Sequence, residues 1–172
     1  MHEQAVPDCR IIGVDLAKSM IQRLTATVQQ KGIGTDRVEL RQADLRDVVV
    51  ENASFVCLNL TLQFLPPEER TVFIQSIFDG MNEGAALLLS EKICFEDQAQ
   101  QDLMTRLHHD FKRAHGYSDL EIAQKRTAIE HRLIPETLQQ HTDRLKTAGF
   151  QTVSVWFQCF NFASLLAIKT GN

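Results

Sequence analysis

The chain has 172 residues, of which 44% are hydrophobic and 23% are charged, and its formal net charge is -4. These values suit one globular domain with its own hydrophobic core and exclude disorder as a description of the whole chain. The negative charge also disfavours broad nucleic-acid binding, because such binding depends on neutralising phosphates.

The sequence also carries signals about location and metals. No apolar run approaches the length of a membrane span, and the polar residues 1–4 contain no apolar signal core. We therefore expect a cytoplasmic protein that makes no membrane contact. The four cysteines are scattered without a Cys-x-x-Cys pair, which predicts reduced core thiols and no metal site.

Strand and helix patterns alternate through the first half of the chain. Residues 10–15 predict a buried parallel strand, and apolar residues at helical spacing predict a helix over 18–31. Further along we predict strands at 38–40 and 54–60, a helix from Pro66 to about Gly80, a turn at 82–84 and a strand at 85–90. This alternation predicts an α/β fold with a mostly parallel sheet and helices on both faces.

The second half of the chain has a different pattern. Residues 95–148 are helical in character, with breaks at Gly116 and Pro135, and we expect a strand-free helical insertion there. Residues 151–157 and 162–169 then predict a closing pair of antiparallel strands. Since no repeat or low-complexity linker interrupts the sequence, residues 1–172 are predicted to form a single domain.

Polar residues close three of the predicted strands. Asp15 ends the first, Asp44 follows the second and Asn59 ends the third. In an open parallel sheet, ligands bind beyond the carboxyl ends of the strands. A carboxylate there can accept two hydrogen bonds from a ribose or one from an adenine amino group, and an amide suits a zwitterionic amino-acid group. The alternative for an aspartate after a strand is a turn or a helix cap.

A glycine-rich loop normally accompanies such a site, between the first strand and the first helix of the sheet. Nothing upstream of Arg10 resembles a strand followed by such a loop. We therefore expect an incomplete domain that lacks the first strand and the glycine-rich loop. An absent central strand would leave buried backbone groups unpaired, so we expect this chain alone to be aggregation-prone.

Five motifs along the chain resemble those of one enzyme family. They are Asn59–Leu65, Leu88–Lys92, His108–Ser118, Gln124–Arg126 and Trp156–Phe162. In this order they are similar to the motifs of carboxy-S-adenosyl-L-methionine synthases, and the resemblance extends over residues 10–169. It implies a Rossmann-like class I methyltransferase fold and a transferase that uses S-adenosyl-L-methionine. The incomplete domain would bind that cofactor weakly.

The resemblance also implies a reaction. Such enzymes make carboxy-S-adenosyl-L-methionine from S-adenosyl-L-methionine and prephenate, and a partner enzyme uses the product to modify a wobble uridine in tRNA. The resemblance implies a homodimer, and we expect no direct nucleic-acid contact. Two alternatives stay open, namely an S-adenosyl-L-methionine-dependent methyltransferase acting on a small molecule and a non-catalytic truncated fragment.

By resemblance, five residues contact the cofactor from the strand ends. Asp15 and Leu16 match a ribose-binding pair whose second member is usually asparagine, so a backbone contact at Leu16 would survive and a side-chain contact would not. Asp44 and Leu45 match an adenine-contacting pair. Asn59 matches the residue beside the methionine part of the cofactor.

Arg126 matches an arginine that holds the added carboxylate and, in such enzymes, reaches across a dimer interface. The guanidinium suits this role because it makes two parallel charge-assisted hydrogen bonds to a carboxylate. Without the resemblance, Arg126 is an ordinary solvated helix charge. No residue is predicted as catalytic.

Two other features favour structural roles. His108 and His109 point in different directions on a helix, so we expect one packed and one exposed histidine in place of a metal pair. The segment Trp156–Phe162 contains no basic residue, which favours a core strand or a dimer contact over a base-stacking platform.

Overall fold

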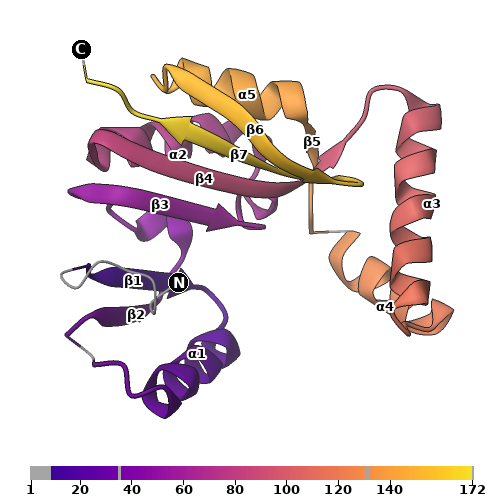
Figure 1. The fold of residues 1–172 in the computed structure, drawn as a ribbon, viewed down its shortest axis with the longest axis horizontal. Coiled ribbons are helices and arrows are strands. Elements are labelled where there is room, and N and C mark those ends of the chain that lie inside the picture. Colours follow the sequence, from indigo (N-terminus) through magenta and orange to yellow (C-terminus); the bar gives the residue numbers. More distant parts are fainter. Residues whose placement is uncertain (1–8, 35, 131, 172) are drawn as a thin grey trace. The chain divides into compact units, whose positions relative to one another are not determined.

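The computed structural model of the chain describes residues 9–34, 36–130 and 132–171. The chain divides into two compact units, Met1–Val48 and Val49–Asn172, and each has its own sheet (Figure 1). The organisation of residues 1–172 as one domain stays a prediction. The predicted lack of a strand and glycine-rich loop before Arg10 concerns mainly residues 1–8, which lie outside the described residues.

The first unit is a strand–helix–strand motif. It contains β1 (Ile11–Asp15), α1 (Lys18–Gln30), β2 (Val38–Gln42) and the short 3-10 helix η2 (Leu45–Asp47). β1 and β2 pair in parallel, and the last pair in register joins Asp15 to Gln42. The predicted parallel strands and intervening helix are therefore confirmed, and both strands end at the same edge of their sheet.

The second unit is a mixed sheet with helices. Its elements are β3 (Ala53–Asn59), η3 (Leu62–Phe64), α2 (Pro67–Gly80), β4 (Met81–Cys94), α3 (Gln98–Ala114), α4 (Asp119–Glu130), β5 (Glu136–Thr137), α5 (Leu138–Thr147), β6 (Thr152–Cys159) and β7 (Phe162–Ile168). The strand order is β3-β4-β7-β6, with β5 paired to β4. β3 and β5 run parallel to β4, whereas β7 runs antiparallel to both β4 and β6, which confirms the predicted closing pair.

Two of the predicted boundaries are wrong. The turn expected at 82–84 lies inside β4, where a register shift opposite β3 takes up the extra residues. Gly84, with a φ of 77°, donates its N–H to the Lys169 carbonyl at 2.7 Å, so a contact from the far end of the chain holds this bulge in the sheet. The insertion at 95–148 is also interrupted, because Glu136 and Thr137 pair with the end of β4.

The core of the second unit lies between its sheet and one pair of helices. Alternate residues of β4 face inward, and Leu87, Leu89 and Ile93 are at most 1% exposed. α2 contributes Ile74 and Ile77, and α5 contributes Leu145, to the same side of the sheet (Figure 1). Glu91 occupies an inward position in the same β4 row and is 0% exposed, so this row places a carboxylate against the hydrophobic core.

Candidate functional site

Asp15 stands at the carboxyl end of β1 and holds the turn into α1. Its Oδ1 accepts the backbone N–H of Ala17 at 2.7 Å, which is the turn-forming role left open by the sequence. Its Oδ2 accepts no hydrogen bond from the described part of the chain. Asp15 can therefore close the turn with one oxygen and offer the other to a ligand hydroxyl.

Leu16 follows Asp15 and is 64% exposed. Its carbonyl accepts a hydrogen bond from the Gln42 side chain at 3.4 Å, which ties the turn after β1 to the end of β2. A ligand contact through the backbone of Leu16 fits this geometry. A polar side-chain contact is impossible for leucine.

Asp44 caps η2 and is engaged on both carboxylate oxygens. Oδ1 accepts the Arg46 N–H at 3.0 Å and the Arg46 Nε at 2.9 Å, and Oδ2 pairs with the Arg46 Nη2 at 2.7 Å. Hydrogen bonds from the Arg46 side chain and backbone lower the pKa of Asp44 to about 2. An adenine amino group would share these oxygens with Arg46, and Leu45 lies half-buried beside them at the start of η2.

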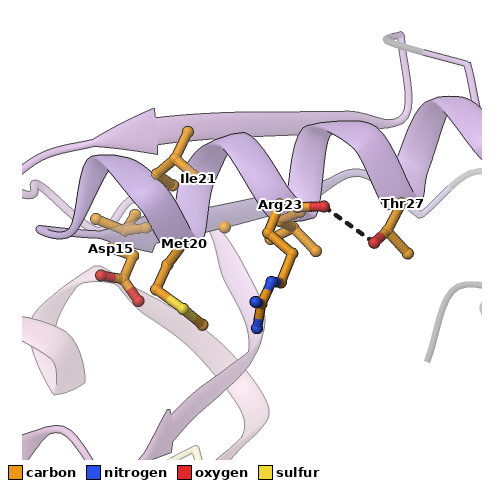
Figure 2. A pocket seen from close by; sticks show the side chains of 8 residues that line it. Asp15, Met20, Ile21, Arg23 and Thr27 are labelled. Carbon is orange, nitrogen blue, oxygen red and sulfur yellow. Dashed lines mark hydrogen bonds between the residues drawn. The ribbon is translucent and has the colours of Figure 1, made fainter.

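An open hollow of about 270 Å³ lies between β1 and α1 (Figure 2). Its lining is mainly apolar, with Asp15 at one end and the side chains of Met20 and Arg23 on the same side as the Asp15 carboxylate. Ligand sites usually measure about 300–1,000 Å³. This hollow alone is therefore too small for a nucleoside with an attached amino acid, although its Asp15 end suits a ribose.

Asn59 ends β3 opposite Ser90 of the parallel strand β4, and its residue is exposed. The chain then leaves the sheet abruptly, since Leu60 adopts a left-handed φ of 56° and donates its N–H to the Ser90 carbonyl at 2.7 Å. The Thr61 hydroxyl donates to the Asn59 carbonyl at 3.0 Å. Asn59 is thus held at its backbone while its exposed position leaves it open to a ligand.

Glu91 lies beneath the turn that follows Asn59 and was not predicted as a functional residue. Its Oε1 accepts the backbone N–H groups of Thr61 and Leu62 at 2.9 and 2.8 Å, and its Oε2 accepts that of Gln63 at 3.2 Å. Burial raises the pKa of Glu91 to about 7, against the opposing effects of these three hydrogen bonds and the charge of Arg70. Its place in the Leu88–Lys92 motif, directly after the strand predicted at 85–90, was the signal available in the sequence.

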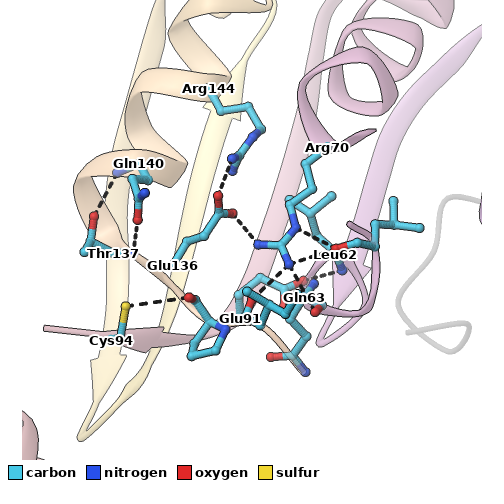
Figure 3. A network of polar contacts seen from close by, with 12 residues as sticks. Leu62, Gln63, Arg70, Glu91, Cys94, Glu136, Thr137, Gln140 and Arg144 are labelled. Atoms are coloured by element: carbon cyan, nitrogen blue, oxygen red, sulfur yellow. Dashed lines mark hydrogen bonds and ion pairs between the residues drawn. The ribbon is translucent and has the colours of Figure 1, made fainter. Parts of the chain in front are cut away.

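A buried ionic network continues from this turn (Figure 3). The Arg70 guanidinium, 0% exposed, donates to the carbonyls of Leu65, Gln63 and Ile134 at 2.8, 3.2 and 2.9 Å. It also pairs with Glu136 at 2.5 Å, and Glu136 pairs with Arg144 at 2.5 Å. Burial raises the pKa of Glu136, but the two arginines outweigh burial and leave it lowered. The turn after β3 is therefore fixed by charged groups on both sides.

The remaining predicted residues have mixed outcomes. Arg126 belongs to α4, and its side chain lies outside the described residues. His108 packs against Phe160 and Phe162, and burial lowers its pKa to about 4, as expected for the packed histidine. His109 is half-buried, so the expectation that it is exposed is wrong.

Two expectations about buried residues also need correction. Trp156 is 64% exposed on β6, at a register shift opposite β7, so a core role for that residue is wrong. All four cysteines are free thiols, but Cys57 is exposed and the other three are only half-buried, so the expectation of core thiols is wrong. Within the described part of the chain, no group of three histidine, cysteine or acidic residues could hold a metal ion.

The structure brings some of the predicted residues together. Asp15 and Asp44 lie at the same edge of the first unit's sheet, because β1 and β2 are parallel and end in register. Asn59 ends a strand of the second unit, and its proximity to the two aspartates stays a prediction.

Comparisons with known proteins identify the family. A methyltransferase domain model matches residues 1–84. The chain is 54% identical over 163 residues to a carboxy-S-adenosyl-L-methionine synthase of Trichlorobacter lovleyi, covering 95% of this chain and 67% of that protein. It is 53% identical over 168 residues to the enzyme of that name from Marinobacter nauticus, covering 98% of this chain and 67% of that protein. The chain thus spans about two thirds of the length of these relatives.

Solved structures support the same fold. An O-methyltransferase family 2 protein from Planctomyces limnophilus superposes with a TM-score of 0.65 at 18% identity, covering 94% of this chain and 43% of that one. This likeness shows the class I methyltransferase fold and agrees with the parallel strand pairs described above. Together with the close relatives, it places the chain in the carboxy-S-adenosyl-L-methionine synthase family of S-adenosyl-L-methionine-using transferases.

Proposed function

We propose that the chain converts S-adenosyl-L-methionine and prephenate to carboxy-S-adenosyl-L-methionine. The observation that carries the proposal is 54% identity to a synthase of that name over 163 residues. The aligned stretch takes in the strand-end residues Asp15, Asp44 and Asn59. The product would serve a partner enzyme that modifies a wobble uridine in tRNA, and this chain itself would not touch the nucleic acid.

The strand-end residues have chemistry that fits the cofactor. The free Oδ2 of Asp15 is an acceptor for a ribose hydroxyl, with Leu16 contributing through its backbone. Asp44 and Leu45 would meet the adenine, since the Asp44 carboxylate has lone pairs beyond those that Arg46 occupies. Asn59, exposed at the end of β3, would contact the methionine part, because an amide can both donate to a carboxylate and accept from an ammonium group.

The overall reaction balances without an added oxidant or reductant. Loss of carbon dioxide and hydroxide converts prephenate to an aromatic pyruvate, and the sulfonium methyl group exchanges one proton for the carboxylate. That proton and the hydroxide form water. Arg126 would hold the new carboxylate through two charge-assisted hydrogen bonds, which a lysine ammonium cannot reproduce.

A cytoplasmic homodimer is part of the same proposal. Apolar side chains are exposed on β6 at Val155, Trp156 and Phe157, a set that we call the β6 patch, with exposed fractions of 44–64%. Large exposed apolar patches mark protein contacts, so we propose that the dimer contact includes these side chains. None of the helices that the structure describes is long and apolar enough to cross a membrane.

The test is a labelled turnover experiment. The purified chain is incubated with S-adenosyl-L-methionine and prephenate labelled with ¹³C in its ring carboxylate, and the products are analysed by mass spectrometry. Appearance of the label in carboxy-S-adenosyl-L-methionine supports the proposal, and labelled bicarbonate in place of prephenate is the control. Transfer of an unmodified methyl group, or no carboxylated product, would contradict it.

A further inference from the structure

The turn that carries Asn59 is anchored from one side by three consecutive residues of β4. Ser90 accepts the Leu60 N–H at 2.7 Å through its carbonyl. Glu91 accepts the next three backbone N–H groups through its carboxylate, and Lys92 donates its own N–H to the Gln63 side-chain oxygen at 3.2 Å. The path of the chain after Asn59 is therefore set by β4.

Three successive N–H groups that converge on one point make an anion site of the kind that usually binds a ligand. Here the anion is the protein's own Glu91 carboxylate, which is 0% exposed and belongs to an otherwise apolar inward-facing row of β4. The donors are used up internally, so this turn does not bind the anionic part of a ligand by its amides. Their function is to fix the turn itself.

The geometry requires both oxygens of a carboxylate. One oxygen serves Thr61 and Leu62, and the other serves Gln63, and all three partners are donors. A glutamine would keep the size of the side chain but would turn an NH₂ group toward one of these donors. A protonated glutamic acid has the same defect, because one oxygen then carries a hydrogen.

We infer that Glu91 is the positioning residue for Asn59 in the cofactor site. Its carboxylate fixes the turn at Thr61–Gln63, which holds Leu60 in its left-handed conformation and thereby sets the direction in which Asn59 leaves β3. Glu91 touches no ligand in this role and acts through the backbone. The inference rests on the proposed function, in which Asn59 contacts the methionine part of S-adenosyl-L-methionine.

The charged groups around Glu91 come from other elements of the second unit. Arg70 of α2 is the charge that acts on it, and Arg70 is itself paired with Glu136 of β5, which also pairs with Arg144 of α5. The lowered pKa of Glu136 keeps that residue ionised near neutrality. Burial raises the pKa of Glu91 to about 7, so Glu91 is the member of this network that changes charge between pH 6 and pH 8.

The experiment combines Glu91→Gln with a neighbouring control. Ser164→Ala removes the hydrogen bond to the Ser90 hydroxyl at 2.6 Å, next to the Asn59–Ser90 pair, without touching the turn amides. Affinity for S-adenosyl-L-methionine is measured by calorimetry from pH 6 to pH 8.5. Exchange of the Thr61, Leu62 and Gln63 amides is followed by NMR over the same range.

We expect the affinity of the unmutated chain to fall as the pH drops through about 7. The protection factors of the three amides, taken against their intrinsic exchange rates at each pH, should fall over the same range. Glu91→Gln should bind about tenfold more weakly at pH 8 and lose this pH dependence, because one good hydrogen bond to a charged group is absent at every pH. Ser164→Ala should keep the pH profile of the unmutated chain.

Equal affinity of Glu91→Gln and the unmutated chain at pH 8 would overturn the inference and leave the proposed function intact. If Glu91→Gln does not fold, Glu91→Asp gives the second test at pH 8, because it keeps the negative charge on a side chain too short to reach all three amides. Equal affinity of Glu91→Asp and the unmutated chain would also overturn the inference. An unmutated chain that does not bind S-adenosyl-L-methionine at any pH refutes the proposed function, and the positioning role falls with it.

Discussion

The carboxylate of Glu91 accepts the backbone N–H of Leu62 at 2.8 Å, across 29 positions of sequence. The bond joins an inward-facing residue of β4 to the turn that follows β3, just beyond the last pair between these two parallel strands. Ligands bind at the carboxyl ends of the strands in open α/β sheets. A buried acid at this place affects both the stability of the second unit and the shape of the candidate site.

The first prediction concerns stability against pH. Because the pKa of Glu91 is raised from 4.5 to about 7, the folded state holds this proton more tightly, and stability falls as the pH rises through that range. Burial lowers the pKa of His141 from 6.5 to about 4, so its contribution is lost as the pH falls through that range. Each pKa shift changes the free energy of unfolding by about 3 kcal/mol at most, and the two changes have opposite dependence on pH.

Single variants should separate the two opposing pH-dependent contributions to stability. His141→Leu should become more stable as the pH falls from 7 to 5, whereas Glu91→Gln should become less stable over the same interval. Urea denaturation followed by fluorescence at several pH values measures both slopes. Parallel pH profiles for the two variants would show that at least one of the buried groups titrates normally.

The second prediction separates the two roles of Asp15. Asp15→Asn keeps an oxygen for the Ala17 N–H but has only one acceptor, so its melting temperature should stay close to that of the unmutated chain while cofactor affinity falls. Asp15→Ala should lower both the melting temperature and the cofactor affinity, and the affinity loss should be about 1–3 kcal/mol. Calorimetric titration and thermal melts distinguish the outcomes. Unchanged affinity in both variants would leave Asp15 as a turn former only.

The third prediction concerns Arg126. If it holds the added carboxylate, Arg126→Ala should erase a preference for carboxy-S-adenosyl-L-methionine over S-adenosyl-L-methionine, a difference of about 1.5–3 kcal/mol. Lys125→Ala, which removes the neighbouring positive charge, is the matched control and should retain the preference. Competition binding with both ligands is the measurement. A preference that survives in Arg126→Ala would assign the carboxylate to another residue.

The fourth prediction concerns the β6 patch. Replacing Trp156 and Phe157 by serine should convert a dimer to monomers that still unfold cooperatively, because both side chains are more than half exposed in the single chain. Val72, 73% exposed on α2, provides the control, and Val72→Ser should leave the association state unchanged. Sedimentation velocity would report the mass of each variant. Dimers that persist in the double variant would place the interface elsewhere.

The sequence by itself determined the helices and strands that have a clear apolar pattern or a clear start or stop residue. The apolar run at 85–90 predicted the central part of β4, and the pair Pro66-Pro67 predicted the start of α2. The polar residues at strand ends were also readable, since Asp15 and Asn59 end β1 and β3 as expected. These features depend on neighbours within a few residues, which is the range over which a pattern carries information.

Only the tertiary structure decided the features that depend on distant contacts. The two-residue strand β5 is too short to have a period and exists because it pairs with the end of β4. Arg70 reads as a surface helix charge but is buried, since the Ile134 carbonyl, 64 positions away, is one of its acceptors. Glu91 likewise acquires its role from amides 28–30 positions earlier. A buried charge is tolerated only where such partners converge, and their convergence is a property of the fold.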